Sequence, residues 1–282
     1  MTDTHHDSRA AVLAELERYC DAVPRSGARA EDFGPLTLFV RDGGAGGPYY
    51  ARPALDATGV VTADAVARVR ARQRELGVPE RFEWVAETTP ALRAAVAGTG
   101  LAVQEYPLMV LDPAAPVPAV PERADGVSVR IVAPGDPVLP SALAVPSLAF
   151  ADPGTATGPA GRAEIDAEIR HQGADGAVAR TEGRMRAGLT RVAAAVDTDG
   201  VALCAGQHQP AVGVSEIVGV GTLPSARRRG LGLAVTAALA ADARATGVRT
   251  VFLSAADDDV ARLYARLGFR HVGTVLIGEP PE

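Results

Sequence analysis

The sequence contains no lysine and no asparagine, so all 28 basic residues among its 282 residues are arginine. Without lysine, a phosphate-binding loop of the Walker type is excluded. A pyridoxal-phosphate enzyme of the standard kind is excluded as well, because its cofactor is held by a lysine Schiff base. No HExxH motif is present, and the five histidines lack the spacing of a zinc site, so we expect no bound metal.

Cysteine, positive net charge and long apolar runs are also scarce. The two cysteines, Cys20 and Cys204, lie in different halves of the chain, which argues against a disulfide framework. The formal net charge of −6 disfavours general nucleic-acid binding. The longest apolar stretch is too short to span a membrane, and the polar N-terminus is not typical of a secretory signal. We therefore expect a cytoplasmic protein that partners neither nucleic acid nor a membrane.

The segment 216–232 carries the strongest functional signal. A β-branched run over 217–222 predicts a strand, and the motif Arg227-x-x-Gly230-x-Gly232 then opens an Ala/Leu-rich helix over 231–246. The first amides of a helix have no partner within the helix, and the helix dipole favours an anion there. Glycine lets the backbone approach phosphates closely, so this pattern predicts a pyrophosphate cradle.

A second block follows the first at a compatible distance. Val251-Phe-Leu-Ser-Ala predicts a strand, and Asp258-Asp-Val-Ala-Arg-Leu-Tyr-Ala-Arg-Leu-Gly-Phe269 predicts a helix that leads into another strand. Together the two blocks resemble the GNAT superfamily of acetyl-CoA-dependent N-acyltransferases. The motifs of that superfamily are Q/R-x-x-G-x-G/A and N-x-x-A-x-x-L-Y-x-x-x-G-F. The sequence departs from them at Asp258, where the family usually has asparagine.

The order of predicted elements suggests two domains. The proline-rich segment 113–126 predicts an extended linker between residues 1–112 and residues 127–282. For 127–282 we expect an α/β (α+β) GNAT domain, with a mixed, mainly antiparallel sheet flanked by helices. Residues 1–112 repeat the helix and strand order but lack both the phosphate motif and the tyrosine. They are expected to form a degenerate GNAT-like domain, with an unrelated α+β domain as the alternative.

The resemblance implies acetyl-CoA as the acyl donor. The backbone near Val220 and Thr222 would pair with the pantetheine arm like an added strand, and the Val220 amide would polarise the thioester carbonyl. The Gly219-Val-Gly221 run is suited to a bulge that opens this slot. The pyrophosphate would be held by the amides of Arg227, Arg228, Arg229, Gly230, Leu231 and Gly232.

Acyl transfer to an amine needs a base for the ammonium ion and an acid for the leaving thiolate. The resemblance implies Glu216 as the base and Tyr264 as the acid beside the CoA sulfur. Alternation along the strand predicts that Glu216, Val218 and Val220 share one face. Ordinary structural roles, as a strand glutamate and a core tyrosine, stay open for both catalytic candidates. Cys204 is not expected to carry an acyl group, since the family transfers directly.

The sequence therefore predicts an N-acetyltransferase that moves an acetyl group from acetyl-CoA to a small-molecule or peptide amine in a ternary complex. Two alternatives stay open: a non-catalytic acyl-CoA-binding or scaffold protein of the same fold, and an unrelated nucleotide-binding module. The acceptor is expected to contact segments 150–188 and 271–279, whose mixed charge selects no particular amine. The oligomeric state is open too, with a homodimer as one option.

Overall fold

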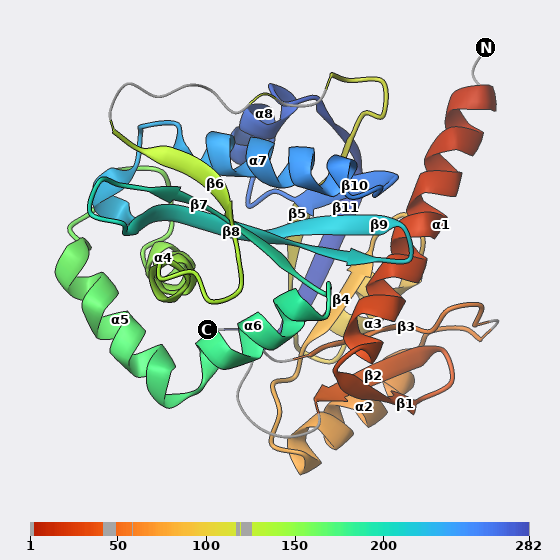
Figure 1. Cartoon of the computed structure of the whole chain (residues 1–282). Helices are drawn as coiled ribbons and strands as arrows, with labels where there is room; N and C mark the ends of the chain where they lie inside the picture. The colour runs from red at the N-terminus through yellow and green to blue at the C-terminus, as the bar shows by residue number, and fades with distance from the viewer. Residues whose placement is uncertain (1–2, 42–48, 58, 117–118, 120–125, 282) are drawn as a thin grey trace. The chain divides into compact units, whose positions relative to one another are not determined.

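The computed structural model describes residues 3–41, 49–57, 59–116, 119 and 126–281, with side chains from residue 9 onward (Figure 1). The chain divides into two compact units that are not continuous in sequence. Unit 1 comprises Met1–Met109, Ser254–Ala261 and His271–Glu282, and unit 2 comprises Val110–Leu253 and Arg262–Arg270. Residues 117–118 and 120–125 of the predicted linker lie outside the described residues. The domain boundaries drawn from the sequence stay a prediction.

Unit 1 is built on a mixed sheet in the order β1-β2-β3-β4-β11-β5. The first three strands pair antiparallel, β3 runs parallel to β4, and β4 runs antiparallel to β11. The elements are α1 (Asp3–Arg25), β1 (Ala28–Asp32), β2 (Leu36–Arg41), β3 (Ala51–Pro53), α2 (Ala63–Glu75), β4 (Phe82–Val85), α3 (Ala91–Ala97), most of β5 (Ala102–Leu111) and most of β11 (Phe269–Glu279).

The last strand of the chain belongs to the sheet of unit 1. Val275 of β11 stands opposite Val85 of β4, and Leu276 stands opposite Trp84. Residues 271–282 were expected in the C-terminal domain, whereas in the structure this strand pairs with the N-terminal part of the chain. A pairing between strands so distant in sequence leaves no signal in a local pattern.

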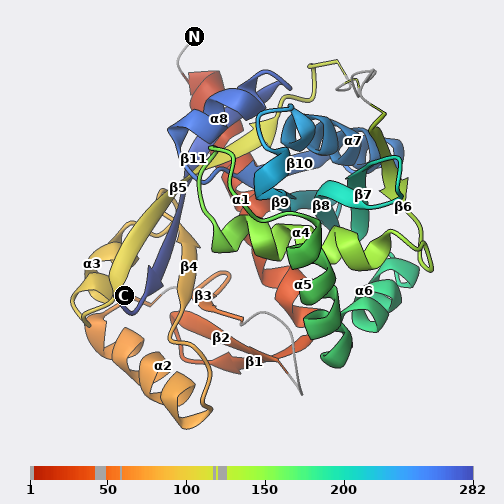
Figure 2. The ribbon, with the colours of Figure 1, turned by 90° about the vertical axis from the view of Figure 1, so that its left-hand side faces the viewer.

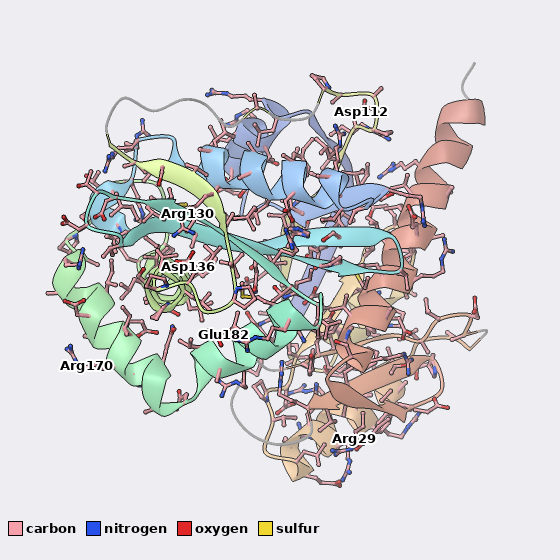
Figure 3. All side chains as sticks on the ribbon, viewed as in Figure 1. Arg29, Asp112, Arg130, Asp136, Arg170 and Glu182 are labelled. Atoms are coloured by element: carbon pink, nitrogen blue, oxygen red, sulfur yellow. The ribbon has the colours of Figure 1, made fainter. Side chains whose placement is uncertain are left out.

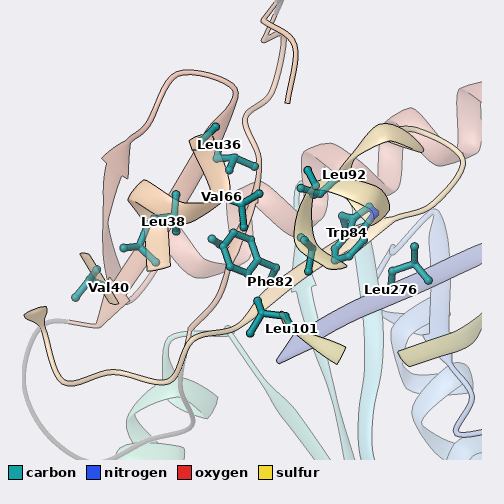
Figure 4. Close-up of a cluster of buried hydrophobic side chains, with 14 residues drawn as sticks. Leu36, Leu38, Val40, Val66, Phe82, Trp84, Leu92, Leu101 and Leu276 are labelled. Atoms are coloured by element: carbon teal, nitrogen blue, oxygen red, sulfur yellow. The ribbon is translucent and has the colours of Figure 1, made fainter. Parts of the chain in front are cut away.

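A cluster of buried apolar side chains forms the core of unit 1 (Figure 4). Phe82 and Trp84 alternate along β4 and so point to the same face of the sheet. Val66 of α2 and Leu92 of α3 belong to the same cluster and are fully buried. The two helices therefore cover this face of the sheet. This packing agrees with the helix and strand order predicted for residues 1–112.

Unit 2 holds the segments with the functional motifs. Its strands β6, β7, β8 and β9 pair antiparallel in that order, and β10 runs parallel to β9. Helices α4 and α7 cover opposite faces of this sheet (Figures 1 and 2). The elements are β6 (Ser128–Val132), α4 (Leu139–Ala151), α5 (Arg162–Ala174), α6 (Ala177–Arg186), β7 (Arg191–Val196), β8 (Ala202–Ala211), β9 (Val214–Thr222), the short helix η1 (Pro224–Ala226), α7 (Leu231–Ala245), β10 (Thr250–Ser254) and α8 (Asp258–Ala265), with the last residue of β10 and the first half of α8 assigned to unit 1.

The observed architecture agrees with the predicted fold class. A mixed, mainly antiparallel sheet flanked by helices is present in unit 2, and α7 begins and ends within one residue of the predicted bounds. Within the described part of the chain, no helix has both the length and the apolar character needed to cross a membrane.

Candidate active site

The turn before α7 alternates between two backbone conformations. Arg227 is extended, with φ −62° and ψ 167°, whereas Arg228 and Gly230 have φ of 66° and 73°. Main-chain amides in a turn of alternating hand point toward one concave side, and such concavities bind anions. This geometry arises from the sequence, since glycine is the residue that takes a positive φ without steric cost. Arg228 takes it as well, and that is unusual for a side chain of this size.

The turn leads directly into the N-terminus of α7. Ala234 N donates to Gly230 O over 3.1 Å, and this is the first main-chain hydrogen bond of the helix. The amides of Leu231, Gly232 and Leu233 precede that bond, so no carbonyl of the helix accepts from them. Gly230 has no side chain to cap them. The positive end of the helix therefore faces the concave turn.

Helix α2 of unit 1 provides a direct contrast. Its N-terminus is capped by Thr62, whose side-chain oxygen accepts from Ala65 N over 3.2 Å. A capping hydroxyl satisfies an amide that could otherwise bind an anion. In chain order each of the two helices is followed by a strand and a further helix, yet of the pair only α7 presents an uncapped N-terminus.

The side chain of Arg227 is committed to the segment that follows α4. The residue is 8% exposed, and its guanidinium donates to the carbonyls of Ala149 (3.1 Å), Ala156 (3.0 Å) and Asp152. The Asp152 carboxylate lies 3.7 Å from Arg227 Nη1. The predicted role of Arg227 concerns its amide. The contacts of its side chain are visible only in the structure.

Strands β9 and β10 separate part of the way along their length. β10 pairs with β9 from Thr250, opposite Val214, to Phe252, opposite Glu216, and the pairing then ends. β9 continues to Thr222. The edge of β9 that faces away from β8 is therefore unpaired with β10 beyond Glu216. An open strand edge of this kind can accept an extended chain through its main-chain groups.

A β-bulge interrupts β9 within this open stretch. Ala205 of β8 stands opposite Gly221 and Gln207 stands opposite Val218, so one residue of β8 faces two residues of β9. Gly219 has φ 64°, the left-handed conformation that a bulge of this kind requires. The bulge predicted from the Gly219-Val-Gly221 run is confirmed.

The bulge decides which residues of β9 face α7. A Cβ at Gly206 would lie 2.8 Å from a methyl carbon of Val220 and 3.3 Å from Leu239 of α7, so Val220 lies on the α7 face. Glu216 stands opposite Gln209, on the other face, which α4 covers. The prediction that Glu216 and Val220 share one face is wrong, because strict alternation assumes a strand without a bulge.

Three of the predicted cofactor-binding residues lie together in space. A Cβ at Gly232 would sit 3.5 Å from Thr222 Oγ1 and 4.0 Å from a methyl carbon of Val220. The first turn of α7 therefore lies against the open stretch of β9. Glu216 lies where β9 and β10 begin to separate, and it is half-buried on the α4 face.

Tyr264 of α8 lies among hydrogen-bonding groups of unit 2. Burial raises the pKa of its phenol to about 12, although a hydrogen bond with the side chain of Thr236 acts in the opposite direction. Thr236, which no sequence pattern singled out, donates to Gly232 O over 2.9 Å. A phenol with this pKa keeps its proton at neutral pH and can act there as a proton donor.

A buried polar network lies between the sheet and α7. His208 Nδ1 is 2.8 Å from Ser215 Oγ, and His208 Nε2 is 2.9 Å from Asp242 Oδ2. Arg191 binds Asp242 through two hydrogen bonds of 2.6 Å each. Burial lowers the pKa of His208 and outweighs the opposing effect of Asp242. The only signal of this network in the sequence was a single aspartate in an Ala/Leu-rich helix.

Charged side chains near α6 have partners within unit 2. Glu182 of α6 accepts from Gly135 N over 2.9 Å, and Arg130 of β6 pairs with Asp136 (Figure 3). Arg170 of α5 is exposed. The first contact fastens α6 to the turn before α4, and the second fastens β6 to the same turn. Among the residues that the structure describes, no three His, Cys, Asp or Glu side chains are grouped as a metal ion would require.

Cys204 of β8 is fully buried. Its sulfur accepts a hydrogen bond from Thr222 Oγ1 over 3.3 Å, and burial raises the pKa of the thiol to about 12 despite that bond. The thiolate is the reactive form of cysteine, so it is scarce at neutral pH.

We expect Cys204 in a Cys20→Ser variant to react with an aromatic disulfide reagent at pH 8 roughly a thousandfold more slowly than an unfolded thiol. Absorbance of the released thiol measures the rate, and the same variant in urea serves as the control. Equally fast labelling of native and unfolded protein would contradict the buried, protonated state of this thiol.

The uncapped helix, the bulge and the separated strands belong to a chain whose fold is similar to that of GNAT proteins. Residues 193–276 match the family model described as FR47-like protein, which is related to the GNAT superfamily. The resemblance predicted from the two motifs is confirmed at the level of the fold, and the likeness to solved structures supports a two-domain GNAT architecture.

Three solved structures illustrate this likeness. A GCN5-related N-acetyltransferase from Kribbella flavida is 23% identical with a TM-score of 0.65, and the match covers 96% of each chain. A putative acetyltransferase of the GNAT family from Novosphingobium aromaticivorans is 20% identical with a TM-score of 0.52, covering 92% of each chain. A tandem GNAT protein from the clavulanic acid biosynthesis pathway is 18% identical with a TM-score of 0.52, covering 88% of this chain and 79% of that one. No curated protein sequence matches the chain.

Proposed function

We propose that the chain is an N-acetyltransferase that moves an acetyl group from acetyl-CoA directly to an amine in a ternary complex. The observation that carries this proposal is the uncapped N-terminus of α7 beside the open edge of β9. Helix amides bind phosphate, and an open strand edge pairs with an extended amide-containing chain. CoA has both a pyrophosphate and an amide-containing pantetheine arm, so one molecule can satisfy both features.

The cofactor-binding roles follow from that fit. The concave turn and first turn of α7 would hold the pyrophosphate through the amides of Arg227, Arg228, Arg229, Gly230, Leu231 and Gly232. Val220 and Thr222 would pair with the pantetheine arm, and the Val220 amide would polarise the thioester carbonyl. The Gly219 bulge supports this assignment, because it interrupts the regular pairing of the strand next to that amide.

The two proposed catalytic residues lie on opposite faces of the sheet. Glu216 is on the α4 face and would take the proton of the amine, directly or through water. Tyr264 contacts Thr236 on the α7 side and would protonate the leaving thiolate. Direct transfer needs a base at the attacking amine nitrogen and an acid at the leaving sulfur, and the two residues would serve these two atoms from different sides of the sheet.

The proposal is tested by titrating the protein calorimetrically with acetyl-CoA and with ATP, and by measuring CoA release over a panel of small-molecule and peptide amines. We expect micromolar acetyl-CoA binding, no competition by ATP, and CoA release with at least one amine. Binding without turnover over the whole panel would favour a non-catalytic acyl-CoA-binding protein. ATP binding without CoA binding would favour a nucleotide-binding module. The cytoplasmic location and the homodimer stay predictions.

A further inference from the structure

The strongest unassigned feature of unit 2 is the attachment of the segment Asp152–Gly161, here called the α4–α5 loop, to the turn before α7. Two main-chain hydrogen bonds join them: Gly158 N donates to Pro224 O, and Ser225 N donates to Ala160 O, each over 3.1 Å. A Cβ at Gly158 would lie 2.2 Å from Asp152 Oδ2 and 3.0 Å from Pro224, so the loop packs closely at this point.

The Arg227 side chain completes this attachment. Ala149 lies in the last turn of α4, where carbonyl groups have no partner within the helix and the dipole favours a cation. The guanidinium binds this carbonyl together with those of Asp152 and Ala156. One planar group therefore fixes the end of α4 and the start of the loop. A lysine could not do the same, because its ammonium lacks the guanidinium's planar fork of donors.

The anchored helix lies on the face of the sheet that carries Glu216. Ala205, Gln207 and Gln209 alternate on one face of β8 and stand opposite Gly221, Val218 and Glu216 of β9. A Cβ at Gly221 would come within 2.7 Å of the Pro146 backbone and 2.9 Å of Ala149, so the end of α4 presses directly on this face. The end of α4 thus covers the same face as the proposed base.

We propose that Arg227 is a positioning residue for the amine acceptor and that its side chain is not a phosphate ligand. This inference rests on the proposed function. The guanidinium holds the end of α4 and the α4–α5 loop as the wall of the acceptor side, while Arg228 of the same turn, which is exposed, supplies charge to the pyrophosphate. The two neighbouring arginines therefore act on different substrates.

Arg227→Gln and Arg228→Gln form a matched pair, since each removes one guanidinium from the same turn. For Arg227→Gln we expect the KM of the amine to rise about tenfold or more, with the acetyl-CoA Kd within about twofold of the wild type. For Arg228→Gln we expect the reverse, with an acetyl-CoA Kd that rises severalfold and depends less steeply on salt than that of the wild type. Arg227→Lys retains the charge and is expected to lie between the wild type and Arg227→Gln.

Hydrogen exchange supplies a readout that does not depend on activity. In Arg227→Gln the amides of the α4–α5 loop, including that of Gly158, should exchange faster. The amides of β7 and β8 should exchange at the same rate as in the wild type, and this unchanged rate would show that the variant is folded. An unchanged amine KM, or a rise in acetyl-CoA Kd equal to that of Arg228→Gln, would overturn the proposal. A wild type that binds acetyl-CoA but acetylates no amine would overturn the proposed function and the acceptor role with it.

Discussion

Gly230→Val is expected to raise the Kd for acetyl-CoA by at least about a hundredfold while the chain stays folded. Gly230 has φ 73°, a conformation that a β-branched residue adopts only under strain. A Cβ at this position has no neighbour within 4 Å, so the effect comes from the backbone rather than from a clash. A backbone that relaxes toward negative φ turns the amides at the start of α7 away from the concave side. Calorimetric titration measures the loss.

Gly247→Val is the matched control for this variant. Gly247 follows the other end of α7 and has φ 85°, and a Cβ placed on it would also have no neighbour within 4 Å. Both substitutions should lower the free energy of unfolding by a similar amount, about 1–2 kcal/mol. Only Gly230→Val should lose acetyl-CoA. Unchanged affinity in Gly230→Val would remove the turn from the site, and loss in both variants would attribute the effect to stability.

Tyr264→Phe is expected to lower kcat by about a hundredfold and to leave the acetyl-CoA Kd within about twofold of the wild type, because positioned proton transfer contributes at least this much. The substitution removes the phenol proton and keeps the ring, which packs against Phe269 with its centroid 6.2 Å away. Steady-state rates and calorimetry separate the two quantities. Tyr106→Phe in unit 1 is the control, because it also removes one phenol hydroxyl, and that hydroxyl bonds to Gln104 outside the proposed site. Equal turnover in Tyr264→Phe would exclude this residue from the mechanism.

The pH dependence gives an independent check on Tyr264. Burial raises its pKa to about 12, so the protonated form persists well above neutral pH. The active form of a general acid is the protonated one, and its loss begins only as pH approaches the pKa. We therefore expect no decrease in kcat from this group up to about pH 10. A decrease centred near pH 8 would indicate that a different group donates the proton.

Most of the backbone geometry of the turn before α7 could be predicted from the sequence. Gly230, Gly219 and the start of α7 depend on backbone preferences of a few adjacent residues, and those preferences are visible in any single sequence. The face of the sheet on which Val220 lies was not predicted correctly. A bulge shifts every residue beyond it to the other face, so an argument from alternation needs the register of the neighbouring strand.

Local sequence was sufficient to predict the strand, turn and helix around Arg227 to Gly232, the bulge at Gly219, and the resemblance to the GNAT fold. Two further features emerge only from the folded chain: the Arg227 side chain binds carbonyls 71 to 78 residues away, and the final strand pairs with β4. The physical reason is the range of the interactions. Backbone conformation and helix ends are set by neighbouring residues, whereas the partner of a buried guanidinium or a strand edge is set by which distant segments pack together.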